Sequence, residues 1–255
     1  MTITLTPLQQ IPLIRRDDHL ADIIVSSLRV TEIELQDNDI LVIAQKIISK
    51  AEGRTVNLVT VTPSQRAMEL AKQTDKDPRV VELMLQESNE ILRTRVGTII
   101  VEHRLGFVCA NAGIDHSNVA GAGDSDEEWV LLLPTEPDRS AEKIRQDIRS
   151  QTGKNVGVLI IDSHGRAWRN GTVGVAIGIA GLPGLVDLRG TPDLFDFTLR
   201  VTQVGAADEL AAAASLVMGQ AAEGTPVVHV RGFPYSLREA SLNELLRHKE
   251  QDLFR

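Results

Sequence analysis

The chain has 255 residues, of which 42% are hydrophobic and 24% are charged, so it can form a real core and is neither disordered nor collagen-like. The core is expected to be aliphatic, because the chain has only two Trp, one Tyr and five Phe. The net charge of −8 argues against a broad nucleic-acid-binding surface. The single cysteine, Cys109, cannot form an internal disulfide, which fits a reducing cytoplasm.

The sequence predicts neither secretion nor insertion into a membrane. The N-terminus lacks the basic region and long apolar stretch of a signal peptide. The longest uncharged run, residues 171–186, is shorter than the roughly 20 residues that a membrane helix needs, and it is rich in glycine. We therefore expect a cytoplasmic protein without a membrane partner.

Short apolar runs bounded by Gly, Pro or Asp predict strands at residues 40–44, 96–102, 129–133, 156–161, 198–204 and 226–230. Asp77 followed by Pro78 is typical of a helix start, with Val81, Met84, Leu85 and Leu92 expected near one face. Ser140 is expected to cap a second helix. Residues 206–222 predict a buried alanine-rich helix, and residues 241–255 predict an exposed amphipathic helix.

The order of these elements is mixed rather than a strict alternation of strand and helix. We therefore predict an α+β (mixed α/β) fold, not a doubly wound sheet. Residues 1–255 are expected to form a single catalytic unit, and this unit could consist of two lobes. The acidic segment 121–128 predicts a flexible loop; a solvated turn is favoured there over a cation site.

Familiar nucleotide and zinc signatures are absent. The sequence has neither the G-x-x-x-x-G-K-[ST] phosphate loop nor a G-x-G-x-x-G that opens a helix after a strand. It also lacks C-x-x-C and H-E-x-x-H, and its six histidines show no metal-ligand spacing.

Four polar clusters could carry chemistry. Residues 48–54, which contain Lys50 and Arg54, could hold phosphate oxygens, although an ordinary basic turn is the favoured interpretation of the spacing alone. Residues 111–118 supply oxygen ligands from Asp115 and Asn118, which suit a hard cation and equally suit an Asx-turn.

The third cluster, residues 157–166, is an apolar strand that runs into Asp162, Ser163 and Arg166. Ligand sites often form at the carboxyl end of such strands, so a functional role is favoured over a simple turn. The fourth, residues 216–224, places glycines and Gln220 at the end of the alanine-rich helix, where a glycine C-cap is the commoner explanation. Close backbone packing is likewise favoured for the glycine run 171–184.

Together and in order, these clusters resemble the coenzyme F420-0:γ-glutamyl ligase family. The matching stretches are residues 11–14, 48–54, 111–118, 131–134, 140–143, 157–166 and 216–219. The resemblance covers nearly the whole chain, and the ordered set of seven stretches is specific although each one alone is weak.

The resemblance implies a GTP-dependent amide ligase that attaches L-glutamate to coenzyme F420-0 and releases GDP and phosphate through an acyl-phosphate intermediate. It also implies a homodimer, two divalent cations (Mn²⁺ or Mg²⁺) and room for K⁺. A carboxylate is a poor acylating agent, and its phosphorylation needs positioning and charge neutralisation more than a protein nucleophile.

By the same resemblance, Asp115 and Asp162 would be metal carboxylates with catalytic roles, Ser163 and Gln220 would join the metal sphere, and Arg166 would act near the transferring phosphate. The nucleotide would be lined by Gln10, Ile11, Pro12, Leu13, Lys50, Asn118, Met218, Gly219, Gln220 and Gly224.

The chain departs from the family in two ways: some relatives carry Glu where this chain has Gln220, and segment 121–128 looks inserted. No carboxyl-terminal flavin-binding domain is expected. The alternative function is a non-catalytic nucleotide- or flavin-binding protein, against which the two metal-type aspartates argue.

Overall fold

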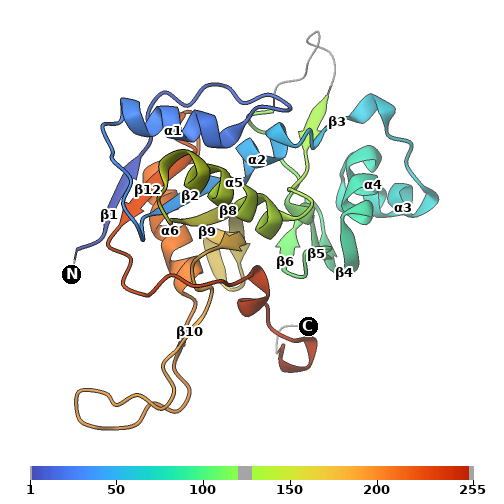
Figure 1. Ribbon diagram of the computed structural model, residues 1–255. Coiled ribbons are helices and arrows are strands. Elements are labelled where there is room, and N and C mark those ends of the chain that lie inside the picture. The colour runs from blue at the N-terminus through green and yellow to red at the C-terminus, as the bar shows by residue number, and fades with distance from the viewer. Residues whose placement is uncertain (1, 120–127, 253–255) are drawn as a thin grey trace.

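The computed structural model describes residues 2–119 and 128–252. Its centre is a five-stranded sheet in the order β1-β12-β2-β8-β9 (Figure 1). The neighbours β2 and β8 are parallel, and the other three pairings are antiparallel. The strands are β1 (Thr4–Pro7), β2 (Ile40–Ala44), β8 (Gly157–Arg166), β9 (Arg169–Ala180) and β12 (Val227–Arg231).

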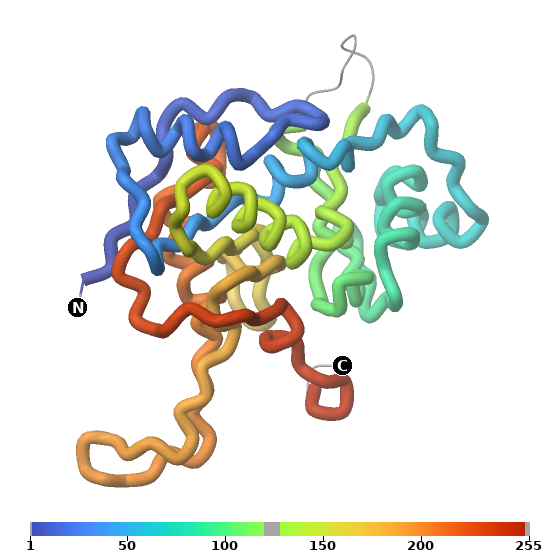
Figure 2. The backbone as a smooth tube through the Cα atoms, in the orientation of Figure 1, coloured from blue at the N-terminus to red at the C-terminus, as the bar shows by residue number. Residues whose placement is uncertain are grey.

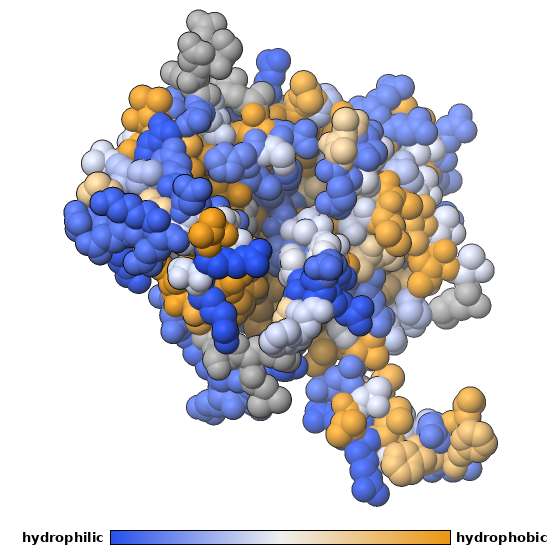
Figure 3. All heavy atoms as spheres, turned by 180° about the vertical axis from the view of Figure 1, so that it is seen from behind, coloured by the Kyte–Doolittle hydropathy of each residue, from blue (hydrophilic) through white to orange (hydrophobic). Residues whose placement is uncertain are grey.

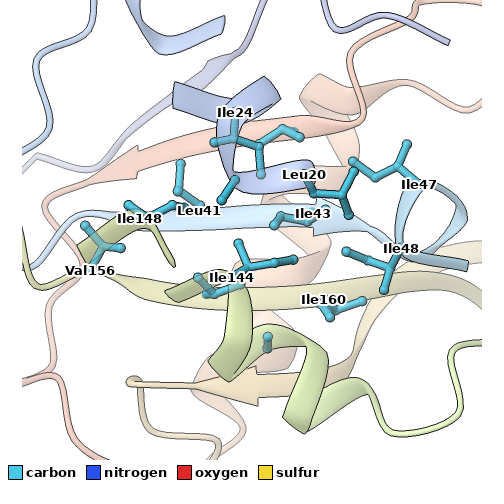
Figure 4. Close-up of a cluster of buried hydrophobic side chains, with 14 of the residues drawn as sticks. Leu20, Ile24, Leu41, Ile43, Ile47, Ile48, Ile144, Ile148, Val156 and Ile160 are labelled. Carbon is cyan, nitrogen blue, oxygen red and sulfur yellow. The ribbon is translucent and has the colours of Figure 1, made fainter. Parts of the chain in front are cut away.

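Helices cover both faces of this sheet because its inner strands are apolar on both sides. Helices α1 (Leu20–Val30) and α5 (Pro137–Thr152) pack against one face, where α2 (Gln45–Ala51) adds Ile47 and Ile48 (Figure 4). Helix α6 (Ala206–Met218) covers the other face. Successive residues of β2 alternate between the two cores, as the period of two in a strand requires.

A second group of elements is formed by residues 55–132 and lies beside the sheet (Figure 1). It has a core of its own, which includes Val81, Met84, Ile99, Val101 and Val130. Its elements are β3 (Thr55–Asn57), α3 (Gln65–Thr74), α4 (Pro78–Gln86), β4 (Ser88–Arg95), β5 (Thr98–His103), β6 (Val108–Ala110) and β7 (Trp129–Leu131), with short 3₁₀ helices at Leu58–Thr60 and Asn111–Gly113.

A narrow arm leaves the central body between β9 and α6 (Figure 2). Its base is the antiparallel pair β10 (Val186–Asp187) and β11 (Gln203–Val204). After β12, the chain crosses the surface, and as far as residue 252 its helical elements are two 3₁₀ turns, Leu242–Glu244 and Lys249–Gln251. In the described part of the chain, no helix combines the length and the apolar character needed to cross a membrane.

The predicted α+β fold is confirmed, and so is the predicted strand at 40–44. Four other predicted strands are present with shifted ends, since β5 spans 98–103, β7 ends at 131, β8 continues to 166 and β12 spans 227–231. The prediction of a strand over 198–204 was wrong for most of its length, because only Gln203 and Val204 pair, at the base of the arm.

The helix predictions needed corrections at their ends. Leu92 lies in β4 rather than on the helix after Pro78, which stops at Gln86. Ser140 does not cap α5, because Pro137 already occupies its first turn. Helix α6 stops at Met218 because Gly219 takes a positive φ of 73°, and the 3₁₀ turns replace the expected C-terminal helix as far as residue 252.

Candidate active site

A large cleft lies at the carboxyl edge of the parallel pair β2 and β8. Ala44 pairs with Ile161, so the residues that follow, Gln45 and Asp162, stand at the same edge of the sheet. Ligands commonly bind at this edge of parallel strands. The cleft has a volume of about 1520 Å³ and is also lined by residues 11–16, by the segment around Asp115 and by the turn after α6. It is therefore larger than the 300–1,000 Å³ of typical small-molecule sites.

Asp115 is held from three sides. Its backbone forms a reciprocal pair of hydrogen bonds with Leu131. Its Oδ2 accepts a 2.8 Å bond from Gln45 Nε2, and its Oδ1 lies 3.3 Å from Lys46 Nζ. Burial raises the pKa of the Asp115 carboxyl, Asp162 adds to the rise, and Lys46 opposes it. The two aspartates, which both line the cleft, thus repel each other, and a bound cation would relieve this repulsion.

Asp162 is fixed by the strand that carries it and by a histidine. Its Oδ2 lies 3.0 Å from His164 Nε2, and both side chains are largely buried. The His164 ring packs against Phe107, with ring centroids 5.3 Å apart. Next to Asp162, Ser163 Oγ donates a 2.9 Å hydrogen bond to Gln220 Oε1, which links β8 to the turn after α6.

Two lysines one turn apart on α2 contribute positive charge to the cleft, which Arg15 and Arg16 also line. Lys46 Nζ donates to the backbone oxygen and to Oγ of Ser117, and Lys50 lies one turn further along the cleft wall. Burial lowers the pKa of Lys50, and Lys46 lowers it further. Such a pair suits the binding of an anionic substrate group.

The turn after α6 forms another wall of the cleft. Met218, Gly219, Gln220 and Gly224 all line it, and both glycines have positive φ. Asn118 Nδ2 donates to the Ala221 oxygen at 3.3 Å and so ties this turn to the segment that carries Asp115.

The structure brings together most of the residues that the sequence singled out. The cleft is lined by Ile11, Pro12, Leu13, Lys50, Asp115, Asn118, Asp162, Ser163, Met218, Gly219, Gln220 and Gly224. Two residues lie elsewhere. Gln10 lines a separate shallow groove beside α1, and Arg166, at the exposed end of β8, donates to the Asn170 oxygen. Of the acidic segment 121–128, residues 121–127 lie outside the described residues, and Glu128 contacts Arg79.

Sequence reasoning missed Gln45, Lys46 and the role of His164. A signal for the first two was present, because they follow the apolar run 40–44 just as Asp162 follows the apolar part of β8. Nothing in the spacing shows that His164 reaches back to Asp162, since both residues belong to a strand that is longer than predicted.

The cleft offers oxygen ligands for a cation but no complete protein cage. Within residues 2–119 and 128–252, no three His, Cys, Asp or Glu side chains are grouped to hold a metal ion. Two carboxylates, the Ser163 hydroxyl and the Gln220 amide oxygen remain as donors. This set fits Mg²⁺ or a similar hard ion that takes its remaining ligands from water and substrate phosphates.

The fold and the cleft define a mixed α+β protein with a large site, lined by both charged and apolar residues, at the carboxyl edge of a parallel strand pair. Residues 9–232 match the family described as F420-0:Gamma-glutamyl ligase, and the chain belongs to that family. It is 47% identical over 257 residues to the coenzyme F420:L-glutamate ligase of Methanothermobacter thermautotrophicus, with all of both chains covered.

Two further relatives carry the same name. The protein of Methanopyrus kandleri is 43% identical over 258 residues, covering 100% of this chain and 98% of the relative. That of Methanocaldococcus jannaschii is 46% identical over 226 residues, covering 89% of this chain and 88% of the relative.

Proposed function

We propose that this protein is a ligase that joins L-glutamate to coenzyme F420-0 during the biosynthesis of coenzyme F420. The observation that carries the proposal is the match over residues 9–232, together with full-length relatives named for this activity. The cleft supports it, because two carboxylates and two lysines suit a reaction between anionic substrates.

The finer proposal is a GTP-dependent reaction in two steps. A carboxylate oxygen of F420-0 attacks the γ-phosphorus of GTP, the bond to the β-phosphate oxygen breaks, and GDP leaves. The amino nitrogen of glutamate then attacks the carbonyl carbon of the acyl phosphate, phosphate leaves, and the nitrogen loses a proton. No protein nucleophile is required, which agrees with the buried Cys109, whose thiol pKa burial raises to about 12.

In this proposal, Asp115, Asp162, Ser163 and Gln220 would hold two divalent cations, Mn²⁺ or Mg²⁺, with K⁺ as a further ion. Bound divalent cations would neutralise charge on the transferring phosphoryl group. Lys46 and Lys50 would orient anionic oxygens, and residues 11–13, Asn118 and the turn 218–224 would line the nucleotide. Arg166 would have to leave its contact with Asn170 to reach a substrate in the cleft.

The test is to incubate the protein with F420-0, L-glutamate, Mn²⁺ and either GTP or ATP, and to follow the product by mass spectrometry. We expect glutamyl mass additions that require both substrates and are faster with GTP. Equal kcat/KM for the two nucleotides would remove the GTP preference alone. Nucleotide binding without any glutamyl product would favour the alternative, a non-catalytic nucleotide- or flavin-binding protein.

We also propose that the protein acts as a homodimer joined through the arm. The arm stands clear of the body and carries hydrophobic residues among hydrophilic ones (Figure 3). Leu194 is 98% exposed, and Phe195, Phe197 and Val201 are also exposed. Several large apolar side chains exposed together on one short segment are typical of an interaction site.

A further inference from the structure

A buried chain of hydrogen bonds leads from helix α2 to Asp115. Ser49 Oγ donates a 2.9 Å bond to Gln45 Oε1, and Gln45 Nε2 donates a 2.8 Å bond to Asp115 Oδ2. Gln45 is only 1% exposed and Ser49 is fully buried, so these polar groups depend on each other rather than on solvent. Gln45 and Ser49 lie on the same side of α2 because they are four residues apart.

Donor and acceptor chemistry fixes which group donates and which accepts in each of these hydrogen bonds. An ionised carboxylate can only accept hydrogen bonds, so the amide group of Gln45 must turn its nitrogen toward Asp115. Its oxygen is then left for Ser49, which donates. A flipped amide would place Gln45 Oε1 against the carboxylate oxygen and leave the Ser49 proton without this acceptor.

The Gln45–Asp115 bond also connects two parts of the protein. Gln45 directly follows β2 and stands beside Asp162 at the edge of the central sheet. Asp115, in contrast, belongs to the segment that pairs with Leu131 of β7, in the second group of elements. The bond therefore crosses from the sheet that carries Asp162 to the segment that carries Asp115.

We infer that Gln45, oriented by Ser49, is a positioning residue that fixes the Asp115 carboxylate near Asp162 for cation binding. The inference rests on the proposed function, in which these carboxylates hold a divalent cation. With Asp115 Oδ2 engaged by Gln45, the other carboxylate oxygen, Oδ1, lies 3.3 Å from Lys46 Nζ. Groups that orient a metal ligand in this way typically contribute about 10- to 100-fold to metal affinity.

The experiment measures Mn²⁺ binding directly, without turnover. Full-length wild type, Gln45→Leu and Ser49→Ala are titrated with Mn²⁺ alone, and the free ion is followed by electron paramagnetic resonance. Ser27→Ala is the matched control, because Ser27 is also a buried helical serine (3% exposed) but lies on α1, does not line the cleft, and donates its hydroxyl to the Gln9 oxygen. Circular dichroism checks that each variant is folded at the temperature of the titration.

We expect Gln45→Leu to raise the Kd for Mn²⁺ by about 10- to 100-fold, Ser49→Ala to raise it less, and Ser27→Ala to leave it unchanged. Gln45→Leu should also lower kcat when Mn²⁺ is limiting, and saturating Mn²⁺ should recover much of that loss. If Gln45 had a merely structural role, added Mn²⁺ would not restore kcat. If Gln45→Leu does not fold, Ser49→Ala decides by its Kd relative to Ser27→Ala.

Two results would overturn the inference, and they differ in whether they also overturn the proposed cation site. If wild type binds Mn²⁺ and the Gln45→Leu and Ser49→Ala variants bind it with the same affinity, the positioning role alone is overturned. Wild type without any bound Mn²⁺ would overturn both this role and the proposed cation site. Loss of binding in Asp115→Asn, measured in the same series, confirms that the titration reports on this site.

Discussion

Asp162 is the residue on which the proposed chemistry depends most. It sits on a strand of the central sheet, is largely buried, and lies close enough to Asp115 to raise the pKa of that carboxyl. Replacing it with Asn keeps its shape and its bond to His164, which can donate or accept, but removes one of the two negative charges. We expect kcat to fall by about 10²–10³, as for the loss of one transition-state electrostatic contact. The melting temperature should hardly change, because the lost charge also relieves repulsion with Asp115.

Steady-state rates and thermal melting on Asp162→Asn decide between two roles. A folded but slow enzyme supports cation binding, whereas normal turnover with a lowered melting temperature would make Asp162 only a structural residue. Asp75→Asn, at an exposed position directly after α3 and outside both the cleft and the arm, serves as the control and should alter neither quantity.

His103 makes stability depend on pH. It is buried (1% exposed), stacks on Phe107 and accepts a hydrogen bond from the Leu105 amide at Nδ1. Burial, then the positive charges of Arg104 and Arg54, lower its pKa from 6.5 to about 4. Between these two values the unfolded chain binds a proton that the folded chain does not, so stability falls as the pH drops through this window.

We expect His103 to contribute a loss of about 2 kcal/mol in the free energy of unfolding between pH 7 and pH 5. His103→Asn retains a δ-position acceptor for Leu105 but cannot titrate, so urea unfolding at the two pH values should show a smaller loss. Asp138 and Asp208, whose pKa values burial raises, act in the opposite direction, and the comparison between the two proteins cancels them. His248→Asn, at an exposed site, should retain the wild-type loss.

At the scale of elements, β9 depends on a bulge and two glycines. Ile160 pairs with Gly178 whereas Ile161 pairs with Ala176, so Ile177 is the extra residue. The bulge turns Gly174 toward α6 and Gly178 toward α5, where an added Cβ would lie 2.5 Å from the Ala211 oxygen and 2.7 Å from the Pro137 backbone, respectively. Carboxylates from both helices bind the bulged strand, since Ala176 N donates to Asp208 and Ile179 N donates to Asp138.

We therefore expect Gly178→Ala to destabilise the protein by about 1–3 kcal/mol, because the methyl group would have to displace helix backbone rather than a flexible side chain. Gly165→Ala in β8, where nothing lies within 4 Å of the added Cβ, should leave the unfolding free energy nearly unchanged. Equal stability of the two variants in urea unfolding would contradict the close approach of α5.

The same elements show which parts of the fold can be predicted from the sequence and which cannot. Hydrophobic runs predict the buried strands β2 and β12, whose residues pack on both faces. They do not predict β9, because its glycines, which fit the strand against two helices, read as breakers. Helix α1 was missed although it buries Leu20, Ile24 and Leu28 at helical spacing. In the site, the ordered polar clusters predict most of the residues that line the cleft. The hydrogen bond from Gln45 to Asp115 could not be predicted, because it depends on tertiary contacts.

At the scale of the whole molecule, the arm is the feature that points most directly to a dimer, because it exposes large apolar side chains that a single chain leaves in solvent. Its tip is ordered by local bonds, since Asp193 Oδ1 accepts from the amides of Phe195 and Phe197, and Arg200 lies over the Phe197 ring. This order holds Leu194 and Phe195 in solvent, 98% and 89% exposed. Burial of such side chains against a second copy would recover about 1.5–3 kcal/mol for each one.

We expect wild type to elute with twice the 27.9 kDa mass of one chain in size-exclusion chromatography with light scattering, and Leu194→Ser/Phe195→Ser to elute at the single-chain mass. The control is Val59→Ser/Val96→Ser, which removes two exposed apolar side chains outside the arm and should retain the dimer. Because the arm stands clear of the central sheet, the arm variant should keep its melting temperature at low protein concentration (Figure 2). A double mutant that still forms the dimer would show that the copies associate through another surface, and a monomeric wild type would remove the homodimer proposal altogether.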